Sequence, residues 1–360
     1  MFDQVGLLPL FIKENRTVAE NERLTNWYRD RGTEAVAQAA TEKKVLPFVA
    51  KTLSSLGLDG AFWEMHLEQF RLRNSRIIAL LDRVYSTLAK HDVKRMFVTE
   101  NLGALLSAGG DIGLFASGDV DNCADISERD KIYAAFEELG FERRERYALQ
   151  NQISATFHPH DEEIGDRFYI SVDFHPLARL KLPCFVNADD FVDWDALYCY
   201  GDTSIRLAPP DALAYICMLH ISLHSFSRAP DARLYFDLIN IAKLPVNYEK
   251  LIAWAAHDHT RIRLATATMI ANRLFAVPLP LDILYSAKAD RVLRLVYNEK
   301  DGDLIYEPHG LKVLLLELLC DDAGILHGLR EIVCPDQAWM NQTYGTAGFT
   351  AHIKHILRIL

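Results

Sequence analysis

The sequence predicts an α/β (α+β) protein in which a small mixed sheet is flanked by N- and C-terminal helical regions. Apolar residues recur at intervals of three and four from Glu20 to about His91, which is the period of an amphipathic helix. The run Phe168–Phe174 instead alternates and is rich in aromatic and β-branched residues, as strands are. Beyond Leu207 the helical period returns. We therefore expect a helical region over residues 1–90, an α/β core over 91–205 and a second helical region over 206–360.

Short β-type and glycine-rich segments mark the predicted core. Val93–Val98 is a β-type run, and a cluster of glycines follows between residues 109 and 113. A helix is expected from Ser127 to Leu139, with Ser127 as its N-cap and Gly140 as its C-terminal stop.

The C-terminal region is expected to be a series of helices. Pro209 and Pro210 open the first of them, because proline is favoured in a first helical turn. The expected ranges are Ala212–Ser225, Ala232–Ala242, Tyr248–His257 and Arg261–Phe275, with further helix around Leu311–Leu319 and His352–Leu360.

Composition excludes several classes of protein. Half of the 360 residues are apolar and 24% are charged, which excludes a largely disordered chain. Forty-nine acidic residues against 39 basic ones give a net charge of −10, and such a surface repels phosphate backbones, so we expect no duplex nucleic acid as partner. A small anionic substrate stays compatible, because a basic pocket or a bound metal reverses the field within one cleft.

The sequence also predicts a cytoplasmic protein. There is no apolar run of about 18 residues, so we expect no membrane partner. The segment Met1–Arg16 carries Asp3 where a signal peptide has positive charge. The six cysteines are scattered without a Cys-x-x-Cys pair, which argues against a zinc ribbon or a disulfide framework.

Asp119 and Asp121 are the main candidates for chemistry. In an extended segment both point to one face, about 7 Å apart at Cα, and Gly118 lets a ligand approach the backbone closely. Such carboxylates repel each other, and a divalent metal is the usual compensation. Asp173 stands in a predicted strand with apolar neighbours, where a carboxylate needs a partner. Three acids on two strands suit one or two Mg²⁺ ions and phosphoryl or nucleotidyl transfer; the alternative is a solvated acidic loop that includes Asp125.

His220 and His224 form a second candidate, because two imidazoles one helical turn apart can bind a metal. No glutamate follows His220, as a zinc-protease motif requires. The neighbouring residues are apolar, so the alternative is a pair of hydrogen-bonded packing histidines.

Basic residues near the core are candidates to offset triphosphate charge, since arginine presents a planar fork to phosphate oxygens. The sequence leaves open which of them point inward. They are Lys94, Arg95, Arg167, Arg179, Lys181, Arg228 and Arg233.

Several short motifs follow one another between about residues 60 and 345: Arg73-Asn74, Gly118-Asp119-Val120-Asp121, Gly140-Phe141, Val172-Asp173-Phe174-His175, Pro210-Asp211, His220 with His224, Tyr235-Phe236-Asp237-Leu238, and Pro335 with Trp339 and Tyr344. Their order resembles the bacterial uncharacterised nucleotidyltransferase family of the DNA polymerase β-like nucleotidyltransferase superfamily. The resemblance implies a sheet of the polymerase β-like nucleotidyltransferase type over residues 91–205.

The resemblance also implies roles for individual residues. Asp119, Asp121 and Asp173 would be the catalytic metal ligands, the first two holding Mg²⁺ on the nucleotide phosphates. Asp173 would complete a second metal site and help to activate the acceptor hydroxyl. Ser117 and Gly118 would shape the loop beside the phosphates.

Three features depart from the family pattern. Glu100-Asn101 stands where the family has Lys-Gly, and Phe115 stands where it has an arginine. Asn101 stays a nucleotide-binding candidate, and Arg179 and Lys181 are candidates to replace the lost cations; a different nucleotide and weak or absent catalysis are the alternatives. In addition, Asp121 is followed by Asn122-Cys123-Ala124-Asp125 rather than by an apolar strand continuation.

The resemblance thus implies a Mg²⁺-dependent nucleotidyltransferase. It would move a nucleoside monophosphate from an NTP to a hydroxyl or phosphate acceptor, which could be a small molecule, a sugar or a peptide of natural-product biosynthesis. One alternative is a non-catalytic binding module with the same fold. The other is a metal hydrolase built on His220 and His224.

Overall fold

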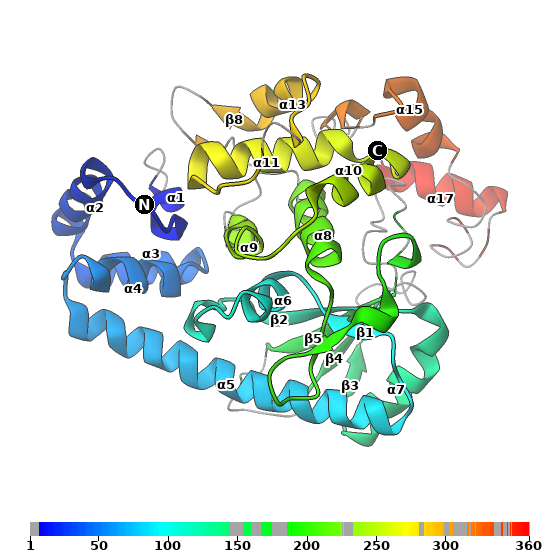
Figure 1. Cartoon of the computed structure of the whole chain (residues 1–360), viewed down its shortest axis with the longest axis horizontal. Coiled ribbons are helices and arrows are strands. Elements are labelled where there is room, and N and C mark those ends of the chain that lie inside the picture. The colour runs from blue at the N-terminus through cyan, green and yellow to red at the C-terminus, as the bar shows by residue number, and fades with distance from the viewer. Residues whose placement is uncertain are drawn as a thin grey trace.

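The computed structural model (Figure 1) describes residues 7–144, 154–159, 164, 167–174, 186, 188–224, 226, 233–280, 284–298, 303–304, 315–316, 318–320, 322–334, 340, 344, 346 and 348–359. Every helix within these ranges is too short or too polar to cross a bilayer.

Five helices form the N-terminal part: α1 (Leu8–Ile12), α2 (Val18–Arg31), α3 (Thr33–Glu42), α4 (Leu46–Ser55) and α5 (Gly60–Lys90). A capping box starts α2, since the side chains of Thr17 and Glu20 each accept a hydrogen bond from the other's amide. Gly32, with a φ of 81°, turns the chain from α2 into α3. The predicted N-terminal helical pattern is thereby confirmed.

A mixed sheet of seven strands follows, in the order β3-β4-β5-β2-β1-β7-β6. In its centre β2 pairs parallel to β5 and antiparallel to β1, and β1 is parallel to β7. The predicted mixed α+β class is confirmed, while the polymerase β-like type stays a prediction. The strands are β1 (Met96–Val98), β2 (Asp119–Ala124), β3 (Glu142–Arg144), β4 (Ser154–His158), β5 (Tyr169–Asp173), β6 (Tyr198–Cys199) and β7 (Arg206–Leu207).

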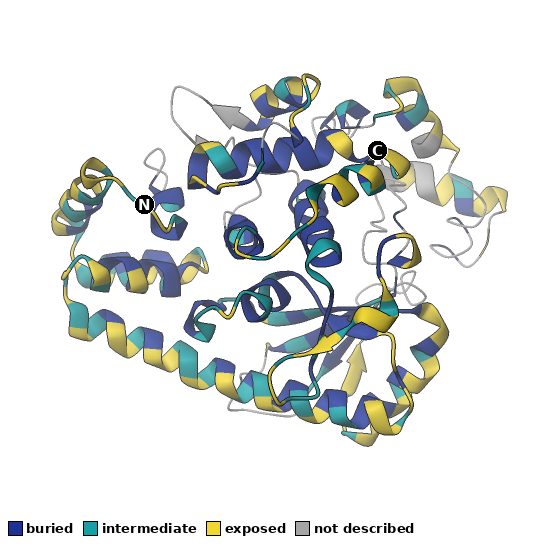
Figure 2. Ribbon diagram, in the orientation of Figure 1, coloured by how far each residue is buried: buried dark blue, intermediate teal, exposed yellow. Residues whose placement is uncertain are grey.

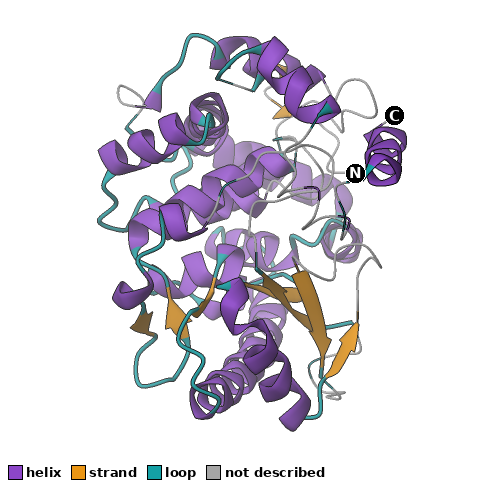
Figure 3. Ribbon diagram, turned by 90° about the vertical axis from the view of Figure 1, so that its right-hand side faces the viewer, coloured by secondary structure: helices purple, strands orange, loops and turns teal. Residues whose placement is uncertain are grey.

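The two faces of the sheet contact different helices. Tyr85 of α5 donates a 2.8 Å hydrogen bond to Asn122 Oδ1, so the even-numbered residues of β2 face α5. In Figure 1, α6 (Glu100–Ser107) and α8 (Pro210–Leu223) lie on the opposite side of the sheet from α5, and the view of Figure 3 shows helices both above and below the strands. The odd-numbered residues of β2, Asp119 and Asp121 among them, therefore point away from α5.

Asn122 also explains why β2 continues past Asp121 without an apolar sequence. Its amide donates to the carbonyls of Val120 and Ser171 at 3.2 and 3.0 Å, while its oxygen accepts from Tyr85. A buried polar side chain that is hydrogen-bonded in this way is compatible with a central strand.

The helix α7 (Arg129–Glu138) begins later than predicted. Asp125 rather than Ser127 caps this segment, because its carboxylate accepts from the Ser127 amide at 2.8 Å and starts a 3-10 turn over Ile126–Glu128. The prediction of Ser127 as N-cap was wrong: the Asp125 carboxylate, paired with Arg95 at 2.7 Å, takes that place. Gly140, with a φ of 76°, follows the helix as predicted.

The C-terminal part is helical, as predicted. The first four helices lie within two residues of their predicted bounds, and α8 and α11 (Arg261–Phe275) bury most of their side chains (Figure 2). Only residues 315–316 and 318–319 of the predicted helix around Leu311–Leu319 are among the described residues. Besides α8, the elements are α9 (Leu234–Ile241), α10 (Tyr248–His257), α11 (Arg261–Phe275), α13 (Ala289–Val296), β8 (Tyr297–Asn298), β9 (Asp303–Leu304), α15 (Ile325–Val333) and α17 (Phe349–Ile359).

One apolar core joins the N-terminal helices, the sheet and the C-terminal helices. Buried side chains from Leu7 to Cys320 form a single cluster. Within it, Phe48 of α4 packs edge-to-face on Phe236 of α9 at 4.9 Å between ring centroids. This contact joins a helix of the N-terminal part to one of the C-terminal part, and the boundaries predicted at residues 90 and 205 stay predictions.

Candidate active site

The three predicted metal ligands come from neighbouring strands. β2 carries Asp119 and Asp121, and β5 carries Asp173; Asp121 lies opposite Ser171, and Asp173 lies opposite Cys123. Residues paired in a sheet share a face, as do alternate residues of one strand, so all three carboxylates are on the same face. Each is partly exposed, although the residues between them are buried.

The register spreads these acids along the face. With about 3.3 Å per residue and about 4.8 Å between strands, the Cα atoms of Asp121 and Asp173 are about 8 Å apart and those of Asp119 and Asp173 about 14 Å. In the described structure the three groups do not bring their oxygens within 4.8 Å of one another. This spacing suits two neighbouring ions that share Asp121 better than one ion held by all three acids.

Two hydroxyl groups orient Asp119. Ser117 Oγ donates to Oδ1 at 2.5 Å, and the Tyr169 hydroxyl donates to Oδ2 at 2.6 Å. Ser117 is buried, and Tyr169 lies opposite Asp119 in the register of β2 and β5. A carboxylate oxygen that accepts one hydrogen bond keeps a further lone pair, so Asp119 is fixed in direction and can still coordinate a cation.

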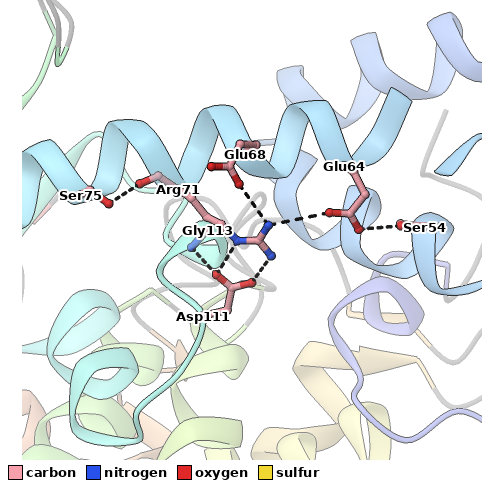
Figure 4. Close-up of polar contacts among 7 residues, drawn as sticks. All are labelled: Ser54, Glu64, Glu68, Arg71, Ser75, Asp111 and Gly113. Atoms are coloured by element: carbon pink, nitrogen blue, oxygen red, sulfur yellow. Dashed lines mark hydrogen bonds and ion pairs between the residues drawn. The ribbon is translucent and has the colours of Figure 1, made fainter. Parts of the chain in front are cut away.

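Helix α5 holds the loop that leads into β2 (Figure 4). Arg71 pairs with both carboxylate oxygens of Asp111, at 3.1 and 2.7 Å, and its Nη1 lies 3.5 Å from Glu68 and 3.8 Å from Glu64. The hydrogen bonds from Arg71 hold the pKa of the Asp111 carboxyl below its usual value. The same carboxylate accepts from the Gly113 amide at 2.9 Å, and a Cβ at Gly113 would come within 2.9 Å of Arg71 Cγ. The close approach of loop and helix therefore requires glycine.

Arg73 and Asn74 fasten the end of this loop. The buried Asn74 amide donates to the carbonyls of Ile112 and Phe115 at 2.6 and 2.9 Å, and its oxygen accepts from Arg73 at 3.0 Å. Arg73 also donates to the carbonyl of Ser117 at 3.1 Å. Burial lowers the pKa of Arg73, and no carboxylate in the described part of the chain forms an ion pair with it. Arg73 therefore leaves positive charge beside Ser117.

Two of the predicted nucleotide-binding residues, Asn101 and Ser117, line one small pocket. Gly118 is exposed, and a Cβ there would meet no atom within 4 Å, so the space beside it is open. Arg179 and Lys181 lie outside the described residues, and their role stays a prediction.

Glu100 places a buried carboxylate at the start of α6. Its backbone φ of 52° lies in the left-handed region, which residues other than glycine rarely adopt. His220 Nδ1 lies 2.9 Å from Glu100 Oε2, at ion-pair distance although the angles fall outside those of a hydrogen bond. Burial, and then the charge of Glu100, raise the pKa of the Asp237 carboxyl on α9 well above its usual value.

The paired histidines contact each other rather than gathering metal ligands. The Nε2 atoms of His220 and His224 are 3.0 Å apart, which is the geometry of the packing alternative. Among the described residues, neither histidine belongs to a group of three metal-ligand atoms.

Three polar residues near the site were not predicted to have a role. Asn74 and Asp237 stand in the apolar faces of helices, and a polar residue in that position is a readable signal of a buried hydrogen bond or charge. Glu100 carries no comparable signal, because its left-handed backbone and its histidine partner depend on the position of α8.

No protein-family model and no curated protein matches the sequence. One match among solved structures is the solution structure of the antibiotic-resistance factor ANT(2'')-Ia, at 10% identity and a TM-score of 0.38, covering 52% of this chain and 94% of that one. A likeness at this level shows nothing about the function of this chain.

Proposed function

We propose that this chain is a Mg²⁺-dependent nucleotidyltransferase that moves a nucleoside monophosphate from an NTP to a hydroxyl or phosphate acceptor. One observation carries the proposal: the β2–β5 register aligns Asp119, Asp121 and Asp173 on one partly exposed face. Carboxylates on neighbouring positions of one face repel one another, most strongly Asp119 with Asp121 and Asp121 with Asp173, and divalent cations are the usual compensation. The open space beside Gly118 and the positive charge of Arg73 support a phosphate group at this end of β2.

The donor set fits magnesium. Mg²⁺ prefers oxygen ligands and is usually held by one or two carboxylates together with water and phosphate oxygens. Asp119 and Asp121 would hold one ion, and Asp121 and Asp173 a second. When bound, the ions would neutralise phosphate charge and favour loss of the acceptor proton.

The protein's own groups would do the remaining work. The acceptor oxygen forms a bond to the α-phosphorus while the bond from that phosphorus to the oxygen bridging it to the β-phosphorus breaks, and pyrophosphate leaves. The acceptor proton passes to a carboxylate oxygen of Asp173. Ser117 and Tyr169 keep Asp119 in one orientation, and the Arg73 guanidinium offsets charge on the leaving pyrophosphate.

The test is calorimetric titration with Mg²⁺ and each of ATP, GTP, CTP and UTP, followed by a pyrophosphate-release assay with the nucleotide that binds. Asp119→Asn and Asp173→Asn should each lower pyrophosphate release by at least about 100-fold, as loss of a group that stabilises a transition state does. Asp130→Asn is the matched control, because Asp130 is an exposed acid on α7 that forms an ion pair with its neighbour Arg129.

Two results would overturn the proposal. One is wild-type protein that binds none of the four nucleotides in the presence of Mg²⁺, which would support the non-catalytic binding module. The other is pyrophosphate release that Asp119→Asn and Asp173→Asn leave at the level of Asp130→Asn.

A further inference from the structure

Glu100 occupies a tight turn between β1 and α6, next to the candidate active site. The turn is tight because α6 returns close to the end of β1: a Cβ at Gly103 would come within 2.6 Å of the Val98 carbonyl oxygen. The left-handed φ of 52° at Glu100 strains this turn, and strain of this kind persists only where the surrounding structure holds the residue in place. The contacts of Glu100 therefore decide whether the turn keeps its shape.

The residue before Glu100 adjoins the second of the three acids. The Thr99 amide donates to the Asp121 carbonyl at 2.9 Å. Val98 lies opposite Asn122, so the extended Thr99 is on the face of the sheet that carries Asp121. In the described structure its buried hydroxyl has no hydrogen-bond partner. A change in the turn would move this hydroxyl and its strand contact.

The residue after Glu100 adjoins the first acid. Asn101 lines the same small pocket as Ser117, and the Ser117 hydroxyl orients Asp119. The turn thus connects to both carboxylates of β2, on one side through Thr99 and on the other through Asn101.

A histidine of α8 reaches the Glu100 carboxylate. His220 Nδ1 lies 2.9 Å from Glu100 Oε2, and both side chains are 8% exposed. A carboxylate at this depth needs compensation, which an imidazole ring can supply. Asp237 and Cys217 lie within range of the charge on Glu100 but do not compensate it, because burial and neighbouring acids raise the pKa of both groups and favour their neutral forms.

The second histidine of α8 orients the first. The Nε2 atoms of His220 and His224 are 3.0 Å apart, so one of these nitrogens donates and the other accepts. This contact fixes the ring of His220, whose other nitrogen is the one beside Glu100.

We propose that His220 is a positioning residue for the candidate active site and acts through Glu100. By holding the Glu100 carboxylate, it keeps the turn between β1 and α6 in its left-handed form. That turn sets the places of Thr99 and Asn101 beside the acids of β2. The inference rests on the proposed function for its catalytic readout, whereas its effect on the turn is measured without any nucleotide.

The first test measures the turn by amide hydrogen exchange. The amides of Thr99 and Gly103 both donate hydrogen bonds at the turn, at 2.9 and 3.3 Å, so their exchange rates report its opening. His220→Leu should speed exchange at both amides by about tenfold or more, and His220→Asn, whose amide can replace Nδ1, should speed it less. His224→Leu is the matched control, because it removes the contact between the two histidines and leaves the contact with Glu100.

Variants of Glu100 separate positioning from a direct part in the reaction. Glu100→Gly and Glu100→Ala both remove the carboxylate, but glycine adopts a φ of 52° without strain. Glu100→Ala and His220→Leu should each lower Mg²⁺-dependent pyrophosphate release by about tenfold to a hundredfold, as a small displacement of site groups does. Glu100→Gly should retain more of this rate than Glu100→Ala. Adding His220→Leu to Glu100→Gly should change the rate by less than about twofold, because the turn no longer depends on the histidine.

Folding is controlled by the same pair of positions. His220→Leu leaves a buried carboxylate without its histidine, whereas the double variant with Glu100→Gly has no such carboxylate. The double variant should therefore unfold at a higher urea concentration than His220→Leu alone.

Three results would overturn the inference. The first is equal exchange at Thr99 and Gly103 in His220→Leu and His224→Leu. The second is additive effects of Glu100→Gly and His220→Leu on the urea midpoint. The third is an equal loss of pyrophosphate release in Glu100→Gly and Glu100→Ala, which would give the carboxylate a direct part in the reaction. Failure of the proposed function is a separate result, a wild type without Mg²⁺–NTP binding, and neither the exchange rates nor the urea midpoints depend on it.

Discussion

Asn74→Leu tests whether α5 positions the loop that carries Ser117. The substitution keeps the branching at Cγ and the number of non-hydrogen atoms, but removes both amide donors from a side chain that is 1% exposed. The carbonyl of Ile112 would still accept a hydrogen bond from the Phe115 amide at 3.1 Å, so losing the bond from Asn74 to this carbonyl costs about 1 kcal/mol. The buried carbonyl of Phe115 would be left without the Asn74 donor, which costs about 1–3 kcal/mol. The sum predicts a loss of about 2–4 kcal/mol in the free energy of unfolding.

Urea denaturation followed by circular dichroism measures this loss as a lower midpoint with an unchanged slope. Ser75→Ala is the control on the same helix: it removes one exposed hydrogen bond to the Arg71 carbonyl and should cost less than about 0.5 kcal/mol. Mg²⁺–NTP binding should weaken in Asn74→Leu, because Arg73 loses its acceptor and Ser117 its fixed position. An Asn74→Leu protein as stable as Ser75→Ala would refute the claim that these bonds hold the loop.

Two further predictions address the nucleotide and the buried acid. Gly118→Ala should change the free energy of unfolding by no more than about 0.5 kcal/mol, since the new Cβ would meet no atom within 4 Å. It should nevertheless lower the Mg²⁺–NTP affinity at least tenfold, because the Cβ would fill the space beside the phosphates. Gly60→Ala, which also creates no clash, is the calorimetric control, and equal affinity in both variants would contradict the prediction. In the folded protein the pKa of Asp237 is raised above its value of about 4 in the unfolded chain. At a pH between these two pKa values the folded protein holds a proton on Asp237 that the unfolded chain has lost, so the free energy of unfolding falls as the pH rises. Asp237→Asn should therefore lose less stability than wild type between pH 5 and pH 8 in urea titrations, and an identical loss in both proteins would be evidence against a buried, proton-binding Asp237.

The sequence predicts the elements of this fold better than the relations between them. Local period and turn chemistry are properties of neighbouring residues, which is why α10 and α11 agree with the predicted ranges and Gly140 follows α7. Ser127 fails as a cap because a carboxylate two residues earlier reaches the same amide, a competition that residue preferences do not resolve. The continuation of β2 through Asn122 likewise depends on Tyr85, which is 37 residues away in the chain.

The candidate site shows the same division. Alternation within β2 is enough to predict that Asp119 and Asp121 share a face. The place of Asp173 depends on the β2–β5 register, which sets it opposite Cys123 rather than opposite either acid. No local pattern contains that register, because it is set by packing on both faces of the sheet. The position of Arg233 beside Ser117 is still less predictable, since it requires α9 to lie against the loop before β2.

Arg73 and Arg233 lie near the place where the sequence lacks the two cations that the family resemblance implies. Phe115, where the family resemblance implies an arginine, is 2% exposed in the apolar core, and Glu100 is turned inward toward His220. A cation at either position would be buried rather than presented to a phosphate, so these departures are consistent with packing of the core and do not by themselves indicate a lost activity. Positive charge beside Ser117 comes instead from Arg73 on α5 and Arg233 on α9. The candidate site therefore includes a helix that precedes the sheet in the chain, α5, and one that follows it, α9. A fragment limited to residues 91–205 would keep the three acids and lose both arginines.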